Sequence, residues 1–331
     1  MNLLFLLLIG EGNLTTNKED VSQQKMNLKL TIPPRVMITG ANGFTGQHAC
    51  IYFKKVGYHV IAVTRTKTEI LSDHQISYEH CELTDKQSVF SLIKKTKPDF
   101  LLHLAGQNHV GKSWTDPITS FEANVMSTAY LLEAIRQENP ICKIIIVGST
   151  LQFNPNNLSS LLHPYSLSKT IQAIIAESWE TLYGMDILIA KPSNLIGPGV
   201  SNGVCSILAK KVIDMELHDA EKILEVNNLY VKRDFLDVRD AITAYETLFK
   251  SGVSGEVYVV SSGKSRYLKE ITDSLRLFST IEFDIKTIHN SPEKTDEFTP
   301  SLLKSIGWEP NIPFEDSIIS ILNYYRAIGV S

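Results

Sequence analysis

The chain has 331 residues, of which 43% are apolar and 21% are charged, and its formal net charge is −4. These fractions are typical of a globular protein, and the length favours one large lobe with a smaller one over two equal domains. The acidic balance gives no reason to expect a nucleic-acid partner. Four cysteines, Cys50, Cys81, Cys142 and Cys205, show neither disulfide nor metal-ligand spacing. We therefore predict free thiols, no bound metal and a reducing, cytoplasmic location.

The N-terminal stretch "LLFLLLI" (3–9) is apolar, but it is far shorter than the roughly 20 residues that a membrane span needs. It lacks the basic residues and the small-residue cleavage site of a secretory signal, and a polar run follows it. Met26 is an alternative start. We expect residues 1–30 to be a poorly ordered extension, and we expect no membrane association.

From Arg35 onward, short runs of β-branched residues alternate with longer amphipathic stretches. We predict strands at 35–40, 59–64, 76–81, 100–105, 143–149 and 186–191, and helices at about 46–56, 85–96, 117–138 and 165–183. Asp85 and Asp116 suit helix N-caps, and Pro117 suits a first helical turn. Several strands are almost continuously Val, Ile and Leu, as in parallel strands buried on both faces. The pattern predicts a doubly wound parallel-sheet α/β fold of the Rossmann type.

The alternation becomes irregular after about residue 193, where "GPGVSNG" (197–203) gathers turn-forming residues. We expect residues 31–192 to form the NAD(P)-binding domain and residues 193–331 a smaller, mixed lobe that binds substrate. A part of that lobe, about 229–262, is expected to return to the first domain.

The stretch "TGANGFTG" (39–46) joins the first predicted strand to the first helix and spaces its glycines as Gly40-x-x-Gly43-x-x-Gly46. The first glycine permits a tight turn, the second lets the backbone approach a pyrophosphate, and the third lets helix and strand pack closely. The helix N-terminus adds amide donors and a positive dipole end. A dinucleotide cofactor is therefore predicted here.

The cofactor type depends on the residue that follows the second strand. NAD sites place a carboxylate there for the ribose hydroxyl, whereas NADP sites use an arginine for the additional phosphate. The stretch "AVTRTK" supplies Arg65 and Lys67, and the first acid is Glu69. A guanidinium pairs with a phosphate through two hydrogen bonds, so we favour NADP(H) over NAD(H).

A candidate reaction centre combines Ser149, at the end of the fifth strand, with Tyr165 and Lys169 in "YSLSK". The four-residue spacing puts the phenol and the ammonium on one face of a helix. A nearby ammonium lowers the pKa of a phenol, which then exchanges a proton with a carbonyl or alcohol oxygen. The serine hydroxyl can hold that oxygen while a hydride moves.

Together these motifs resemble the extended short-chain dehydrogenase/reductases, in their nucleotide-sugar epimerase/dehydratase/reductase group. The resemblance covers residues 35–326. Its markers include "TGANGFTG", "HLAGQ" (103–107), "GST" (148–150), "YSLSK", "KPSNLIGPG" (191–199), "RDFLDVRD" (233–240) and "GWEP" (307–310). The resemblance implies an NAD(P)-dependent oxidoreductase that acts on a nucleotide sugar.

The resemblance also assigns roles to single residues. Ser149, Tyr165 and Lys169 would be the catalytic set, with Asn124 supporting the lysine, and Asn194 and Arg233 would contact the sugar nucleotide together with Ser149. The cofactor contacts that it implies are Gly40, Asn42, Gly43, Phe44, Gly46, Arg65, Glu82, Leu83, Leu104, Ala105, Asn124, Tyr165, Lys169 and Pro192. It further implies a homodimer that pairs the helices at 117–138 and 165–183.

Within the group, the C-terminal half is most similar to GDP-4-keto-6-deoxy-mannose reductases. Several positions depart from the usual pattern: Glu82 is one methylene longer than the common Asp, Lys191 replaces an Arg, and the loop between Phe153 and Tyr165 is short. The resemblance implies a GDP-linked 4-keto-6-deoxymannose as substrate. The departures predict a rim built differently, near Gln152 and Phe153, and thus a different substrate such as a UDP-linked 4-keto-6-deoxy-N-acetylhexosamine.

Four functions remain open, and Leu151 and Arg65 help to choose between them. Dehydratases of the group carry a Glu two residues after the catalytic Ser or Thr, and Leu151 stands in that place here. An epimerase does not need that acid, but it recycles a tightly held NAD, which Arg65 disfavours. We favour a 4-ketoreductase, with a 4-epimerase as the alternative and a 4,6-dehydratase or a non-catalytic NADP-binding regulator as weaker ones.

Overall fold

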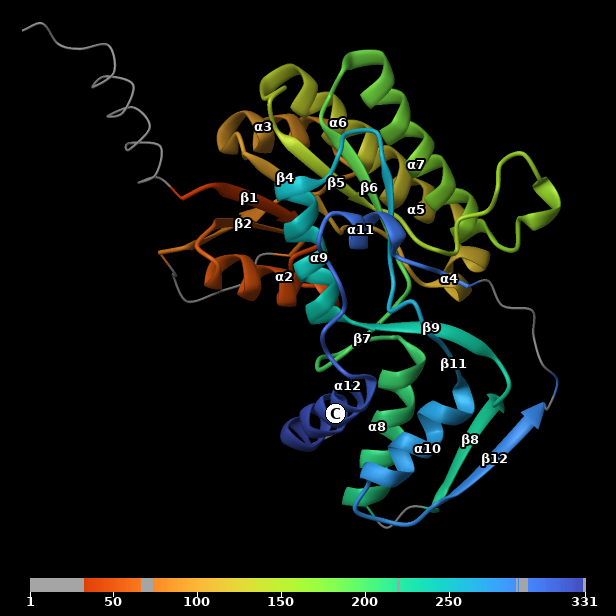
Figure 1. Ribbon diagram of the computed structural model, residues 1–331. Coiled ribbons are helices and arrows are strands. Elements are labelled where there is room, and N and C mark those ends of the chain that lie inside the picture. The colour runs from red at the N-terminus through yellow and green to blue at the C-terminus, as the bar shows by residue number, and fades with distance from the viewer. Residues whose placement is uncertain (1–32, 67–73, 219–220, 290, 292–296, 330–331) are drawn as a thin grey trace, which may run out of the picture. The chain divides into compact units, whose positions relative to one another are not determined.

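The computed structural model describes residues 33–66, 74–218, 221–289, 291 and 297–329 (Figure 1). The chain divides at Pro34, and the unit from Arg35 onward is the one described below. The predicted extension at 1–30, Lys67 and Glu69 lie outside the described residues. Within those described ranges, no helix is long and apolar enough to cross a membrane.

A sheet of seven parallel strands forms the larger part of this unit. Its order is β10-β6-β5-β4-β1-β2-β3. The strands are β1 (Arg35–Thr39), β2 (His59–Thr64), β3 (Ile76–His80), β4 (Phe100–His103), β5 (Lys143–Val147), β6 (Ile187–Pro192) and β10 (Val257–Val260). Six of them confirm the predicted strands, and their order 3-2-1-4-5-6 is that of a doubly wound dinucleotide-binding sheet.

Helices cover both faces of the sheet (Figure 1). α2 (Phe44–Lys55) and α9 (Val238–Ser251) pack on one face. α3 (Lys86–Thr96), α6 (Ser127–Glu138) and α7 (Pro164–Tyr183) pack on the other. The shorter helical segments are α4 (Val110–Thr115), α5 (Pro117–Phe121), η2 (Leu158–Ser160) and, near the C-terminus, α11 (Ser301–Ser305). Because apolar residues of the strands face both layers, the sheet is buried on both sides.

The capping predictions are confirmed. The carboxylate of Asp85 accepts from the amides of Gln87 and Ser88 at the start of α3. The carboxylate of Asp116 accepts from the amide of Thr119, and Pro117 follows it in the first turn of α5. Both caps satisfy amides that a helix start leaves without an internal partner.

The single helix predicted at 117–138 instead consists of three consecutive segments. A π-helical turn, η1 (Glu122–Met126), separates α5 from α6 and contains Asn124. Two side chains that follow Asn124 bond to backbone carbonyls of this turn: Ser127 Oγ donates to Ala123 O at 2.6 Å and Thr128 Oγ1 to Asn124 O at 2.7 Å. Such wide turns are rare and occur mostly within α-helices at functional sites.

The C-terminal part adds two small sheets. β7 (Asn194–Ile196), β9 (Lys232–Asp237) and β11 (Ser265–Tyr267) form one, and β8 (Ile223–Asn228) and β12 (Asp284–His289) form the other. Their apolar residues join α8 (Val204–Leu217), α10 (Leu268–Phe278) and α12 (Phe314–Ile328) in a separate core. β9, α9 and β10 carry the chain from this core back to the main sheet. The domain limits given above stay predictions.

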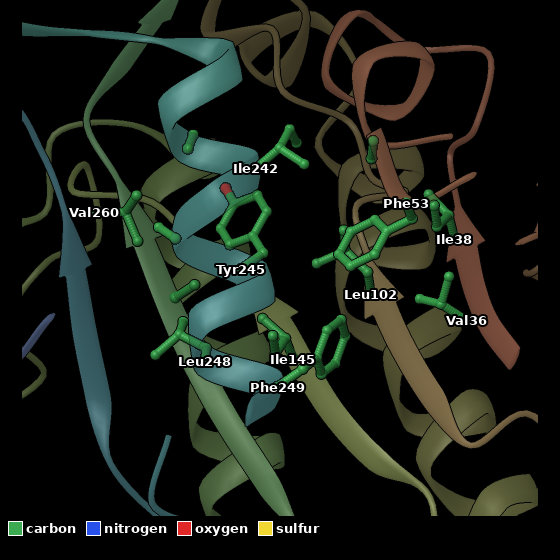
Figure 2. Packing of buried hydrophobic residues seen from close by; sticks show 14 of the residues in the cluster. Val36, Ile38, Phe53, Leu102, Ile145, Ile242, Tyr245, Leu248, Phe249 and Val260 are labelled. Atoms are coloured by element: carbon green, nitrogen blue, oxygen red, sulfur yellow. The ribbon is translucent and has the colours of Figure 1, made fainter. Parts of the chain in front are cut away.

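The core between α2, α9 and the sheet contains Tyr245, whose side chain is surrounded by apolar residues (Figure 2). Its ring is fully buried, and its hydroxyl has no hydrogen-bond partner among the described residues. A buried hydroxyl without a partner costs about 1–3 kcal/mol. We therefore expect Tyr245→Phe to raise the free energy of unfolding by about 1 kcal/mol in urea titrations. If Tyr245→Phe instead lowered the free energy of unfolding by about 1 kcal/mol, the Tyr245 hydroxyl would have a hydrogen-bond partner after all.

Candidate active site

The glycine-rich loop joins β1 to α2, and its backbone segments approach each other closely. Gly40 has a φ of +69°, a conformation that favours glycine. A Cβ atom on Gly46 would lie 2.1 Å from Gly40 O and 2.8 Å from Ala41 Cα. Close backbone contact, and not only flexibility, therefore requires glycine at positions 40 and 46.

The loop fits a dinucleotide cofactor. Asn42 and Gly43 are exposed, and Gly43 caps α2 without a side chain that would occupy the helix amides. Phe44 packs against the loop of the C-terminal part: a Cβ on Gly199 would lie 3.2 Å from the Phe44 ring. An open helix N-terminus with a narrow glycine cradle is the arrangement that binds a pyrophosphate.

The other predicted cofactor contacts follow the ends of neighbouring strands. Arg65 comes directly after β2 and is exposed. Glu82 follows β3, and its Oε1 accepts from the hydroxyl of Thr84 at 2.9 Å. Leu83 beside it is buried. Because parallel strands end at one edge of a sheet, these residues lie along the same edge as Gly40.

Two more predicted contacts, Leu104 and Ala105, follow β4 and are half-buried. The backbone of Ala105 lies against the glycine-rich loop, since a Cβ on Gly40 would be 3.0 Å from Ala105 N and Cα. Pro192 ends β6, and its carbonyl accepts from the amide of Thr150 at 3.3 Å. The roles of all these residues toward a cofactor stay predictions.

The predicted catalytic set is brought together at the end of β5. Ser149 follows β5, while Tyr165 and Lys169 lie one turn apart on α7. All three are buried, with exposed fractions of 8%, 6% and 6%. The Ser149 hydroxyl interacts with the phenol of Tyr165 and acts to lower its pKa. The structure thus places a serine hydroxyl, a phenol and an ammonium at one point of the sheet edge.

The electrostatics of the set differ from the sequence prediction in one respect. Burial raises the pKa of Tyr165, and the interaction with Ser149 opposes this rise only in part. The Lys169 ammonium donates to Val147 O at 2.7 Å and to Gln172 Oε1, and burial lowers its own pKa to about 7. The expected lowering of the pKa of Tyr165 by Lys169 is therefore wrong for this state, because desolvation dominates.

Three side chains hold the first turns of α7: its own N-cap residue, one residue of α4 and one residue of η1. His163 Nδ1 accepts from the amide of Ser166, and Ser113 Oγ accepts from the amide of Tyr165 at 3.1 Å. Asn124 Nδ2 donates to Ser168 Oγ at 2.9 Å, between the two predicted catalytic residues of α7. Sequence analysis missed Ser113 and Ser168, because nothing in a lone serine indicates a partner so far along the chain.

Asn124 also fixes the segment after β4. Its Oδ1 accepts from the amide of Gln107 at 2.8 Å, and its Nδ2 donates to Gln107 O at 3.0 Å. A Cβ on Gly106 would lie 2.5 Å from Asn124 Oδ1, so glycine is needed at that position. Asn124 is fully buried and thereby ties η1 to the "HLAGQ" segment and to α7.

The residues after Ser149 have orientations that the sequence does not reveal. Gln152 Nε2 donates to the backbone carbonyl of Lys169 at 2.7 Å, and the amide of Phe153 donates to Thr170 Oγ1 at 3.1 Å. Phe153 is buried, whereas Leu151 is 46% exposed. Gln152 and Phe153 therefore attach this loop to α7, and Leu151 is the side chain that faces outward.

The predicted substrate residues lie on neighbouring strands of one small sheet. Asn194 starts β7, is exposed, and donates from Nδ2 to Asp234 O at 2.9 Å. Arg233 on β9 is half-buried and donates from Nη1 to Lys232 O at 2.8 Å. β7 follows β6 after a single residue, so this sheet begins beside the edge that carries Pro192. Substrate contact by Asn194, Arg233 and Ser149 stays a prediction.

A buried histidine beside the set gives the fold a pH dependence. Burial, with a smaller contribution from the charge of Lys169, lowers the pKa of His103 from 6.5 to about 3. Between these values the unfolded chain carries a proton on His103 that the folded chain does not. The free energy of unfolding therefore falls as the pH falls below 6.5, with a slope of up to about 1.4 kcal/mol per pH unit from this group.

Urea titrations over this acidic range are expected to follow that slope in the unmodified protein. His103→Gln should be less stable at neutral pH but should show a flatter pH dependence, because it has no group to titrate. The same replacement at the exposed His80 controls for the loss of a histidine. An unchanged slope in His103→Gln would show that other groups govern the acid response.

Comparison with known proteins finds one family match and relatives that align over most of this chain. The NAD dependent epimerase/dehydratase family matches residues 36–261. The GDP-6-deoxy-D-mannose reductase of Pseudomonas aeruginosa is 27% identical over 309 residues, which cover 88% of this chain and 97% of that protein. The structure of RMD from the same organism, complexed with NADPH, aligns with a TM-score of 0.75 at 25% identity, over 89% of this chain and 99% of that one.

Other relatives have different activities in their names. The dTDP-D-glucose 4,6-dehydratase of Mus musculus is 24% identical over 324 residues, covering 88% of both chains. A putative UDP-glucose 4-epimerase of Methanocaldococcus jannaschii is 26% identical over 312 residues, covering 88% of this chain and 98% of its own. The family match spans more than half of the chain and includes the glycine-rich loop, Ser149, Tyr165 and Lys169. The chain therefore belongs to the NAD dependent epimerase/dehydratase family.

Proposed function

We propose that the protein is an NADPH-dependent reductase of the 4-keto group of a nucleotide-linked 4-keto-6-deoxyhexose. The observation that carries the proposal is the buried grouping of Ser149, Tyr165 and Lys169 at the end of β5. Leu151 is exposed where a dehydratase has an acid. The bound nicotinamide supplies the hydride. Ser149 holds the carbonyl oxygen, and the phenol of Tyr165 gives its proton to that oxygen.

Tyr165 carries the proton that reduction of a keto group requires. Burial raises the pKa of its phenol, so the phenol is protonated at neutral pH. Leu151 has no titratable group, so this position cannot provide the acid or base that elimination of water requires. The reductase of Pseudomonas aeruginosa is a relative over almost its whole length.

NADPH is the proposed cofactor because Arg65 follows β2 at the position that distinguishes the two dinucleotides. The RMD structure that aligns with this chain was obtained with NADPH. Michaelis constants for NADPH and NADH in the unmodified protein and in Arg65→Ala test this assignment. A preference for NADPH that disappears in Arg65→Ala supports it, and a preference for NADH in the unmodified protein contradicts it.

The test of the reaction is a panel of GDP-, UDP-, CDP- and dTDP-linked 4-keto-6-deoxy sugars incubated with NADPH. A reductase consumes one NADPH for each alcohol formed. The alternative, a 4-epimerase, is supported by the putative UDP-glucose 4-epimerase among the relatives, and it converts 4-hydroxy sugars without net cofactor consumption. Epimer formation without NADPH consumption would favour that alternative and contradict the reductase.

We also propose a homodimer through α5, α6 and α7, in which each chain pairs these helices with those of its copy. Exposed apolar side chains on two of these helices, Ile118, Ile174 and Leu182, support this contact. Light scattering after size-exclusion chromatography measures the mass directly. A monomeric mass at micromolar concentration contradicts the proposal.

A further inference from the structure

The Lys169 ammonium lies deep in the protein without a carboxylate beside it. Its Nζ donates to the backbone oxygen of Val147 at 2.7 Å and to Oε1 of Gln172. Within the described part of the chain, Lys169 forms no ion pair. A buried ammonium without a counter-charge depends on hydrogen-bond acceptors for its stability and its direction. Of the two acceptors, Gln172 is the one supplied by a side chain.

Gln172 is fully buried, and its neighbours determine which end of its amide faces Lys169. Its Nε2 donates to Thr128 Oγ1 at 2.8 Å. Thr128 uses its own proton in the bond to Asn124 O, so toward Gln172 it can only accept. The amide nitrogen of Gln172 must therefore point to Thr128, and its oxygen must point to the ammonium.

The same threonine is fixed by a second chain of hydrogen bonds. His103 Nε2 lies 2.9 Å from Thr128 Oγ1, and His103 Nδ1 lies 2.8 Å from Thr39 Oγ1. The Thr128 proton goes to Asn124 O, so His103 Nε2 must donate to Thr128. In the neutral ring Nδ1 is then an acceptor, and Thr39 donates to it while accepting from the amide of Ala105 at 3.1 Å. Thr39, His103, Thr128 and Gln172 are all fully buried.

The geometry points to Gln172 as a positioning residue for Lys169, held in place by the buried series Thr128, His103 and Thr39. This series runs from the last residue of β1, next to Gly40, through β4 and α6 to the ammonium on α7. Each member has one orientation, so the Gln172 oxygen is fixed and the ammonium is held one helical turn from Tyr165. The inference rests on the proposed reductase function for its catalytic meaning.

Few charged or titratable groups surround Lys169, so replacing Gln172 should change the titration of Lys169 itself. His103 on β4 interacts electrostatically with the ammonium, and Tyr165 lies on the same helix. From α6 and η1 the contacts are Thr128 and Asn124, which do not titrate. On β6, Lys191 interacts with Glu177. A change at Gln172 therefore acts on Lys169 directly and not through another ionisable group.

Two variants separate positioning from a purely structural role. Gln172→Leu removes the acceptor and should move the titration of Lys169 to lower pH, because only the charged form gains from that oxygen. Gln172→Glu places a carboxylate against the ammonium and should move the titration to higher pH. We expect shifts of about one pH unit in opposite directions and a fall in kcat of about tenfold at neutral pH in Gln172→Leu.

The titration is measured by NMR of protein labelled with ¹³C at the lysine ε-carbons, without cofactor, and the Lys169 signal is assigned by its absence in Lys169→Met. The pH dependence of kcat/KM for NADPH oxidation is the second readout. Ser206→Ala is the control, because it removes a buried hydrogen bond to Tyr325 outside the site. Ser206→Ala should lower the stability of the fold and leave both the Lys169 titration and the pH dependence of kcat/KM unchanged.

Opposite shifts in the two variants support positioning by Gln172. If both variants lose stability while Lys169 titrates as in the unmodified protein, Gln172 is a structural residue and the inference is overturned. If Gln172→Leu does not fold, Gln172→Met, with a chain of similar length, takes its place. If the unmodified protein oxidises no NADPH with any keto sugar, the proposed function fails, and the NMR titration still decides the role of Gln172.

Discussion

Tyr165→Phe is expected to lower kcat by about 10²–10⁴-fold while leaving NADPH binding within a few-fold of the unmodified protein. The ring keeps its place on α7, but the proton that the keto oxygen must receive is lost. Turnover is measured by NADPH absorbance with the best substrate of the panel. Cofactor affinity is measured by fluorescence titration without substrate.

Tyr183→Phe makes the same change at the other end of α7, where the side chain is 50% exposed, and should leave turnover unchanged. Turnover of Tyr165→Phe within tenfold of the unmodified protein would show that another group donates the proton. A non-catalytic regulator would have no turnover to lose, and its cellular effect would be indifferent to this substitution.

Gly46→Ala is expected to destabilise the fold by about 2–4 kcal/mol and to abolish measurable NADPH binding. The added carbon would lie 2.1 Å from Gly40 O and 2.8 Å from Ala41 Cα, and both are backbone atoms that cannot rotate away. Either α2 or the glycine-rich loop must shift. Such a shift widens the cradle whose narrowness lets the backbone approach a pyrophosphate. Urea titration and fluorescence titration measure the two effects.

Gly203→Ala provides the matched control outside the loop. Its new carbon would meet the flexible hydroxyl of Ser201 at 3.3 Å, so stability and NADPH affinity should change little. A Gly46→Ala protein with the affinity of the unmodified protein would contradict the close contact between loop and helix described above.

The main sheet could be predicted from sequence because its strands are continuous apolar runs, as in "KIIIV" of β5, separated by helices with visible caps such as Asp85. The small sheets could not, because β7 and β11 have three residues each and are defined by pairing with β9 across long stretches of chain. The π-helical turn at Glu122–Met126 leaves no periodic signal of its own. Sequence patterns therefore predict the strands and helices that residues close along the chain determine, and not those that depend on distant pairing.

The candidate site likewise has residues that the sequence predicts and residues that only the structure reveals. The predicted grouping of Ser149, Tyr165 and Lys169 at one strand end needed only motif spacing and the order of a parallel sheet. The partners that hold Tyr165 and Lys169, Ser113 and Gln172, carry no such spacing and become visible only through contacts. The pKa of Tyr165 could not be predicted from the Tyr-x-x-x-Lys spacing, because burial raises it and the Lys169 ammonium bonds elsewhere.

The π-helical turn separates the packing of α6 from the placement of Asn124. Because such a turn accommodates one residue more than an α-helical turn, deleting one residue from 122–126 would let α5 and α6 continue as one regular α-helix. Leu131, Leu132 and Ile135 would keep their face toward α3 and the sheet. The turn residues would change place, so Asn124 would lose its bonds to Gln107 and Ser168. The extra residue therefore serves the site and not the core, and a one-residue deletion here should lower activity more than stability.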